Sequence, residues 1–184
     1  ETSGIIIIAK NFISHSFISK QFERRTVKKT YKALIWGKSP DKGVVKGNII
    51  RSSKDRKSFI LTDSEKGRYS KTEYEIIEYI APISYIRLNP LTGRTHQIRV
   101  HMKSIGHPII SDEIYLGGNK MIKSFHVKYS KILKKVLKTV SRVALHAQSI
   151  EIIHPSTNKK VKFNVEVPND IKNAIKVIKD NESI

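Results

Sequence analysis

The sequence predicts an α+β fold in which a mixed, mainly antiparallel sheet is flanked by roughly four helices. Four strand-like runs follow one another between residues 43 and 89, separated by turn residues and without a helical period among them. Amphipathic helical periods occur before and after this region. With 184 residues, 39% of them hydrophobic, the chain suits one domain, and we expect residues 1–184 to form it.

The N-terminal part predicts a strand, a helix and a second strand. Residues 4–9, "GIIIIA", form a short β-branched run typical of a fully buried strand. Asn11 is suited to cap a helix that runs to about Arg25. The apolar residues expected on one face of this helix are Ile13, Phe17, Ile18 and Phe22. Residues 29–37, "KTYKALIWG", then predict a strand that ends at a turn.

The four central runs predict an antiparallel meander, with strands at residues 43–50, 57–62, 70–80 and 83–89. The period changes after them, because Ile98, Met102 and Ile105 are spaced as on one helix face. We therefore expect a helix at about residues 96–105, with Thr95 as its N-cap and Gly106 just beyond its end.

The last part predicts two more helices and a strand pair. Residues 124–140 form a basic amphipathic helix whose lysines either contact phosphate or face solvent. Residues 144–153 and 159–167 predict paired strands around the turn "HPSTNK", and a helix at about 169–180 follows.

The charge of the chain favours a polyanionic partner. Lysine and arginine number 35 against 16 acidic residues, which gives a formal net charge of +19. Such a charge destabilises a compact chain through self-repulsion, so nucleic acid is the expected partner. The chain has no cysteine, which excludes disulfides and fits a reducing compartment, and we expect a cytoplasmic protein. No apolar run is long enough to span a membrane, so no membrane partner is expected.

Metal and cofactor sites are not supported. His96 and His101 are five residues apart and point in different directions on a helix, and no HExxH pattern is present. Nucleotide-binding GxxxxGK[ST] and GxGxxG patterns are absent too. No GxSxG pattern occurs, although composition alone leaves a Ser-His-Asp triad open. We therefore expect neither metal nor cofactor.

A loop–helix junction remains as the candidate site. Gly93 allows close approach of backbone, the helix N-terminus offers free N–H groups, and Arg94 adds a permanent charge. This arrangement suits an anion, although an ordinary capped helix with a surface arginine has the same pattern. The candidate residues of the junction are Thr92, Gly93, Arg94, Thr95, His96 and Gln97.

The same residues resemble a known family. "LTGRTHQIRVHMKSIGHPIISDEIY" is similar to the T-G-R-[ST]-H-Q-[IL]-R-V-H, G-H-P and D-x-x-Y motifs of RluA-type pseudouridine synthases. "KTYKALIWG" resembles the K-x-Y-x-A segment of that family, and "ALHAQSIEIIHPSTNKKVKF" its L-H-A…H-P segment. "ETSGIIIIAKN" resembles the part just after its signature H-R-L-D-x-x-T-S-G. The resemblance extends from Glu1 to about residue 180.

The resemblance implies a pseudouridine synthase catalytic fold and a reaction without cofactor or metal. Uridine in RNA becomes pseudouridine when the N-glycosidic bond breaks and the base rejoins through carbon. It implies that Arg94 pairs with a catalytic aspartate and that Tyr31 packs against the target base. The aspartate should stand two places before Glu1, so we expect residues 1–184 to be an N-terminally truncated and inactive domain. Arg99 and His101 are expected either to contact RNA phosphates or to be structural.

Looser similarity favours the RluD-like branch, which implies large-subunit (23S-type) ribosomal RNA, or a precursor of the large subunit, as the partner. A tRNA-modifying relative and a non-catalytic RNA-binding protein remain alternatives. A DNA-binding regulator is disfavoured, because residues 96–105 offer few side chains for reading a groove.

Overall fold

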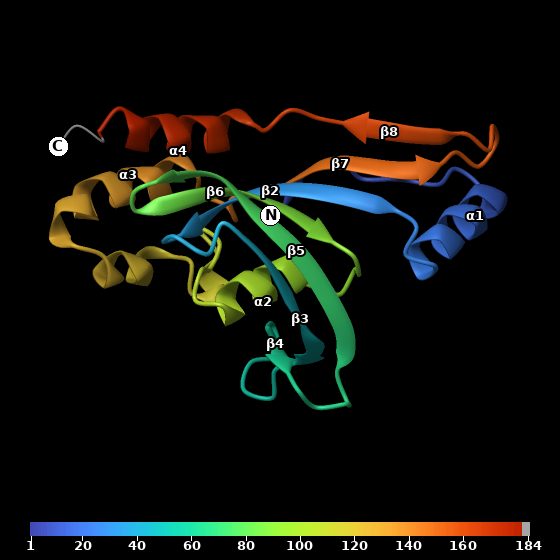
Figure 1. Cartoon of the computed structure of the whole chain (residues 1–184), viewed down its shortest axis with the longest axis horizontal. Helices are drawn as coiled ribbons and strands as arrows, with labels where there is room; N and C mark the ends of the chain where they lie inside the picture. The colour runs from blue at the N-terminus through green and yellow to red at the C-terminus, as the bar shows by residue number, and fades with distance from the viewer. Residues whose placement is uncertain (182–184) are drawn as a thin grey trace.

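The computed structural model describes residues 1–181, and they form one eight-stranded sheet with helices packed against it (Figure 1). The strand order is β1-β7-β2-β6-β5-β3-β4, and β8 also pairs with β7. Every pairing is antiparallel except that of β1 with β7. The predicted α+β class and mainly antiparallel sheet are therefore confirmed. The strands are β1 (Ser3–Gly4), β2 (Lys28–Trp36), β3 (Lys42–Arg51), β4 (Phe59–Thr62), β5 (Arg68–Ile80), β6 (Ile83–Pro90), β7 (Leu145–Ile153) and β8 (Lys160–Asn164).

Four α-helices accompany the sheet in the described residues, as expected: α1 (Phe12–Glu23), α2 (Gln97–Ser104), α3 (Ser130–Thr139) and α4 (Asn169–Lys179). Three short 3-10 helices lie between α2 and α3, at Glu113–Tyr115, Asn119–Ser124 and Val127–Tyr129. Within residues 1–181 no helix is long and apolar enough to cross a bilayer.

The core is centred on β2. Its residues 33–36 are each 0% exposed, and because successive strand residues point to opposite faces, both faces of the strand are covered. The neighbouring strand β6 adds Ile83, Ile86 and Leu88, while α3 and α4 add their apolar sides. This packing explains why the run "ALIW" has no alternation. It holds β2 in a rigid position at the middle of the sheet, which matters because β2 also provides Tyr31.

The expected buried strand at residues 4–9 is wrong. Only Ser3 and Gly4 pair with β7, and the chain beyond them lies extended but outside the sheet. Ile6 and Ile8 are 80% and 78% exposed, whereas Ile5 and Ile7 are half-buried. Beyond Gly4 the run no longer pairs with β7, whose residues 149–153 pair with β8 instead. The apolar composition of residues 4–9 therefore did not indicate a strand that is buried on both faces.

Helix α1 begins where predicted, because the Asn11 side chain accepts a hydrogen bond from the backbone N–H of Ser14 at 2.8 Å. Its expected apolar face is only partly correct, since Phe17 and Ile18 are half-buried but Ile13 is 79% exposed. The buried residue of the helix is Gln21, whose amide exchanges hydrogen bonds with the backbone of Ile153.

Three other expectations need correction. The central strands do not form a simple meander, because β3 pairs with β4 on one side and with β5 on the other, which places β4 at the sheet edge. Thr95 does not cap α2; the cap position is His96, in a left-handed conformation without a side-chain cap. The predicted helix at 124–140 is shorter, since 3-10 turns precede α3. Gly106 follows the end of α2 with a φ of +82°, as expected.

Candidate active site

A cleft of about 810 Å³ lies between β2, the β6–α2 loop and the start of the chain. It is lined by residues that are far apart in sequence, among them Glu1, Lys29, Tyr31 and Arg94. The fold thus brings together Tyr31 and Arg94, the two residues that the resemblance placed in the catalytic site. The other predicted site residues that line it are Thr92, Gly93, His96, Gln97 and Arg99.

Tyr31 lies on β2 between β6 and β7, opposite Leu88 and Ala147. The pairing of β2 with β7 shifts register between Thr30 and Tyr31, because β7 carries one extra residue there, Gln148, whereas β2 pairs regularly with β6. Tyr31 is half-buried and packs against the core, and this burial raises the pKa of its hydroxyl. The phenol therefore stays protonated at neutral pH and presents an aromatic ring in the cleft.

Arg94 is held at the edge of the cleft by its loop. Its Nε donates a hydrogen bond to the carbonyl oxygen of Tyr69 at 3.0 Å, and its backbone N–H donates to the Gln97 side chain at 3.0 Å. Burial, together with the nearby guanidinium groups of Arg68 and Arg25, lowers the pKa of Arg94. Within residues 1–181 no carboxylate lies within 4.0 Å of its guanidinium group. The site therefore has positive charge that an anion can neutralise.

Gln97 determines the shape of this loop. Its side-chain oxygen accepts hydrogen bonds from the Thr92 hydroxyl at 2.6 Å and from the backbone N–H of Arg94. Its amide nitrogen donates to Lys71 and Thr72 on β5. Thr92 and Gln97 are both buried, so they position the loop rather than offer groups to a ligand. Gly93 and Thr95, by contrast, are exposed.

Lys29 lines the cleft as well, although the sequence did not lead us to predict it. Its Nζ donates to the carbonyl oxygen of Thr92 at 3.0 Å and lies 5.9 Å from the centre of the Phe22 ring. Burial lowers the pKa of this ammonium group. The signal was available, because Lys29 is the lysine of the K-x-Y-x-A segment and lies two residues before Tyr31, on the same face of β2.

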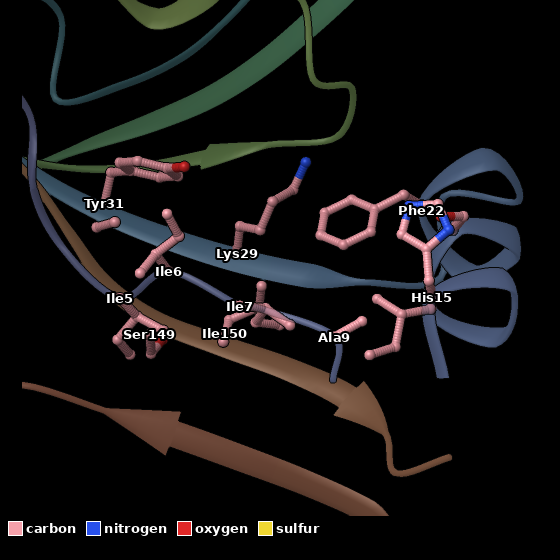
Figure 2. A pocket seen from close by; sticks show the side chains of 13 residues that line it. Ile5, Ile6, Ile7, Ala9, His15, Phe22, Lys29, Tyr31, Ser149 and Ile150 are labelled. Carbon is pink, nitrogen blue, oxygen red and sulfur yellow. The ribbon is translucent and has the colours of Figure 1, made fainter. Parts of the chain in front are cut away.

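Lys29 also borders two smaller hollows beside the cleft. One, of about 230 Å³, is lined by three basic residues, Arg25, Lys29 and Arg94, and by one acidic residue, Glu23. The other, of about 370 Å³, is mostly apolar. Figure 2 shows Lys29 lying between Tyr31 and Phe22 in this second hollow, with Ile6 and Ile7 near it. A planar group bound at Tyr31 would thus have apolar surface on one side and cations on the other.

The helix behind the loop is a buried support. Arg99 is 7% exposed and forms a two-pronged ion pair with Asp112, with both N···O distances at 2.7 Å. His101 is 0% exposed, and its ring nitrogens are hydrogen-bonded to Ser70 and Thr72. An RNA contact through His101 does not fit this position, and Arg99 reaches the cleft only with its charge already paired.

His96 connects the loop to this support. Its Nδ1 lies 2.9 Å from the hydroxyl oxygen of Tyr115, which in turn accepts a hydrogen bond from the backbone of Phe59 on β4. Burial, then the charge of Arg99, lowers the pKa of His96. The ring is therefore neutral near pH 7. No group of three or more metal-ligating side chains occurs among the described residues.

Comparison with known proteins identifies the family. The sequence profile of the RNA pseudouridylate synthase family matches residues 1–104, which is more than half of the chain.

The chain belongs to the RNA pseudouridylate synthase family.

Its relatives are similar over nearly the whole chain. An uncharacterized RNA pseudouridine synthase of Chlorobaculum parvum is 37% identical over 97% of this chain and 55% of its own length. The ribosomal large subunit pseudouridine synthase D of Zymomonas mobilis is 33% identical over 97% of this chain and 53% of its own. The dual-specificity RNA pseudouridine synthase RluA of Haemophilus ducreyi is 34% identical over 90% and 69%. The predicted RluA-type, RluD-like similarity is confirmed, and the chain spans about half the length of most of these relatives.

Solved structures agree with the fold. Human RNA pseudouridylate synthase domain containing 1 superposes with a TM-score of 0.65 at 27% identity, over 86% of this chain and 62% of that chain. Human RNA pseudouridylate synthase domain containing 4 has a TM-score of 0.64 at 18% identity, which supports the fold alone. The expected pseudouridine synthase catalytic fold is therefore confirmed.

Proposed function

We propose that this chain forms the catalytic part of an enzyme that isomerises uridine to pseudouridine in RNA. The observation that carries the proposal is the meeting of Tyr31 and Arg94 in one cationic cleft on a fold of this family. The reaction breaks the bond between N1 of the base and the ribose, and joins the ribose to C5 instead. A tritium atom at C5 of the uridine is released to water when the new bond forms.

The geometry supports a separate part for each residue. The ring of Tyr31, held protonated on a rigid strand, can pack against the target base. Arg94 has a forked donor set and no carboxylate partner among residues 1–181, so it can hold the catalytic aspartate that the resemblance places before Glu1. Arg25 and Lys29 beside it can neutralise phosphates next to a uridine that has been flipped out of its helix.

The substrate that we propose is large-subunit ribosomal RNA, alone or in a precursor of the large subunit. Relatives named for the ribosomal large subunit support it. A relative named as having dual specificity keeps the tRNA alternative in view. An action on ribosomal RNA also fits the cytoplasmic location expected from the lack of cysteine.

The two non-enzymatic alternatives differ in their support. A DNA-reading role is disfavoured, because six of the eight residues of α2 are buried and cannot enter a groove. A non-catalytic RNA-binding protein with this fold would keep the cationic cleft, but its gene would not encode the catalytic aspartate. Sequencing upstream of the codon for Glu1 distinguishes this alternative from the enzyme.

Tritium release tests the proposal. The full-length protein, with whatever residues its gene encodes before Glu1, is incubated with unmodified ribosomal RNA or tRNA containing C5-tritiated uridine. Release from ribosomal RNA supports the function and the substrate, and release from tRNA alone assigns the tRNA alternative. No release from either would overturn the enzyme. The same assay on residues 1–184 alone tests the expectation that this stretch is inactive without the aspartate.

Arg94→Ala provides the residue-level test. Removing one charged group that stabilises the reacting centre typically lowers kcat by about 10²–10³-fold. Arg94→Lys keeps the charge but loses the fork, so we expect it to recover only part of the rate. Arg24→Ala, an exposed arginine that does not line the cleft, is the matched control. Equal rates for the Arg94 and Arg24 variants would exclude Arg94 from catalysis.

A further inference from the structure

A second basic region lies outside the cleft. Residues 114–150 contain no aspartate or glutamate, but they contain seven lysines and one arginine. The arginine, Arg142, is paired with Asp170 at 2.8 Å. Within residues 1–181, none of the seven lysines has a carboxylate oxygen within 4.0 Å. The seven lysines therefore form no ion pair within the described part of the chain.

Five of these lysines form one surface, which we call the lysine face: Lys128, Lys131, Lys134, Lys135 and Lys138. All five are exposed. Four of them lie on α3 at spacings of three, four and seven residues, which places them within an arc of about 100° at 3.6 residues per turn. The opposite side of α3 is apolar, and its Leu133 and Val136 are each 0% exposed.

Without a bound anion, the lysine face lowers the stability of α3. Like charges three and four residues apart repel, and α3 has four such pairs among its lysines. No glutamate or aspartate occurs within α3 to offset them. A bound polyanion would turn this repulsion into attraction.

The surface is also hollowed. A groove of about 720 Å³ lies between α3, the end of α4 and the β5–β6 turn. Lys128, Lys131 and Lys135 line it together with the Tyr129 ring, whose centre is 5.0 Å from the Lys128 ammonium. Three cations and an aromatic ring in one groove suit a sugar–phosphate segment.

The lysine face is separate from the candidate active site. None of its residues lines the cleft. In Figure 1, α3 lies at the left end of the molecule, whereas α1, which contributes Phe22 to the cleft, lies at the right end. A ligand that reaches both must be long.

We propose that the lysine face is a second RNA-binding surface, which holds the phosphate backbone of the substrate at a distance from the target uridine. The choice of RNA as partner rests on the proposed function. An anionic membrane is the competing polyanion, but a membrane-bound amphipathic helix needs a free apolar face to insert. The apolar side of α3 is packed into the core, so only charge is available.

The test compares two variants of the full-length protein with equal charge. One is Lys131→Gln/Lys134→Gln/Lys135→Gln/Lys138→Gln, and glutamine keeps the helix propensity of lysine. The control neutralises four exposed lysines elsewhere, namely Lys10→Gln, Lys20→Gln, Lys159→Gln and Lys162→Gln. Thermal unfolding checks that both variants are folded.

The readout is the equilibrium affinity for a long fragment of large-subunit ribosomal RNA, measured from 50 to 200 mM salt. Because each lost phosphate contact lowers the slope of log affinity against log salt by about 0.7–0.9, we expect the lysine-face slope to fall by about 3–4. The control slope should change by about 1 at most. Both variants should keep the parent rate of tritium release on a short stem-loop, which only the cleft must hold.

Equal slopes for the two quadruple variants would overturn the proposal. So would an unchanged RNA slope combined with lost binding to phosphatidylserine vesicles, which would assign the surface to a membrane. RNA affinity can be measured without turnover. If the protein binds RNA through the lysine face but releases no tritium, the proposed enzymatic function is wrong and the proposed RNA-binding surface still stands.

Discussion

Gly93 lies in the β6–α2 loop and lines the cleft. A Cβ added at this position would meet only the Nζ atom of Lys29, at 3.8 Å, which is an ordinary contact. The folded chain therefore has room for a side chain here, and only a bound ligand would make glycine necessary.

We predict that Gly93→Ala leaves the melting temperature nearly unchanged but weakens RNA binding by about tenfold or more, since a loss of about 1.4 kcal/mol is one factor of ten. Calorimetry and RNA titration measure the two effects. Gly4→Ala is the contrasting variant, because its Cβ would lie 2.2 Å from the carbonyl oxygen of Ala147 and the fold itself should suffer. Full RNA affinity in Gly93→Ala would mean that no ligand approaches this loop.

His101 gives the chain a pH-dependent stability. Burial lowers the pKa of its ring from 6.5 to about 4. The unfolded chain therefore takes up a proton first as the pH falls, so the stabilisation is complete above about pH 6.5 and is lost between 6.5 and 4. The full effect is roughly 3 kcal/mol, from about 1.4 kcal/mol for each pKa unit.

We predict that His101→Gln makes the free energy of unfolding less dependent on pH between 6.5 and 4. Urea denaturation at several pH values measures this slope, which separates the proton effect from any loss of packing at pH 7. His96 and His146, whose pKa values are also lowered, should retain part of the slope. His15→Gln, at an exposed position, is the matched control for the substitution itself. An identical slope in His101→Gln would contradict the prediction.

At the scale of elements, α2 is attached to the turn that follows it by the Arg99–Asp112 pair. Asp112 is 0% exposed and also accepts a hydrogen bond from the backbone N–H of Tyr115. The pair therefore connects the helix behind Arg94 to the tyrosine that contacts His96. The pair thus supports the helix that follows the Arg94 loop, and Arg99 itself also lines the cleft.

We predict that Asp112→Ala lowers the free energy of unfolding by about 3–5 kcal/mol, because it leaves the Arg99 guanidinium buried without its main counter-charge. Arg99→Met/Asp112→Leu, which removes both charges, should recover much of that loss. Glu75→Ala breaks partly exposed ion pairs with Lys42 and Arg87 and should cost far less stability than Asp112→Ala. If Asp112→Ala costs no more than Glu75→Ala, the pair does not hold α2.

At the scale of the whole molecule, the net charge of +19 opposes folding. Added salt screens repulsion between exposed charges, since the screening length falls from about 10 Å at 0.1 M to about 3 Å at 1 M. We therefore predict that sodium chloride raises the melting temperature of the RNA-free protein, where each kcal/mol gained corresponds to about 2–4 °C for a chain of this length. Thermal unfolding across a salt series measures it.

The contrary outcome for the whole molecule is a melting temperature that falls as salt is added. It would mean that attractive surface pairs such as Lys172–Glu166 and Lys179–Glu78 outweigh the net repulsion. The lysine-face variant offers a matched comparison, because it removes four charges from one helix and should depend less on salt than the parent.

The sequence by itself determined the fold class, the order of most elements and the family. Local patterns carry this information: alternation for the strands, a period of 3.6 for the helices, and the motif residues around Tyr31 and Arg94. It also indicated the polyanionic partner through composition. None of these depends on which distant segments meet.

Only the tertiary structure decided which side chains are buried and which distant segments contact each other. It exposed Ile6 and Ile8 because the chain leaves the sheet after Gly4, and it placed β4 at the sheet edge. It turned Arg99 and His101 inward, where long-range partners satisfy their polar groups. It also added Lys29 to the cleft. Burial and charge pairing arise from contacts between residues far apart in the chain, and a local sequence pattern does not predict such contacts.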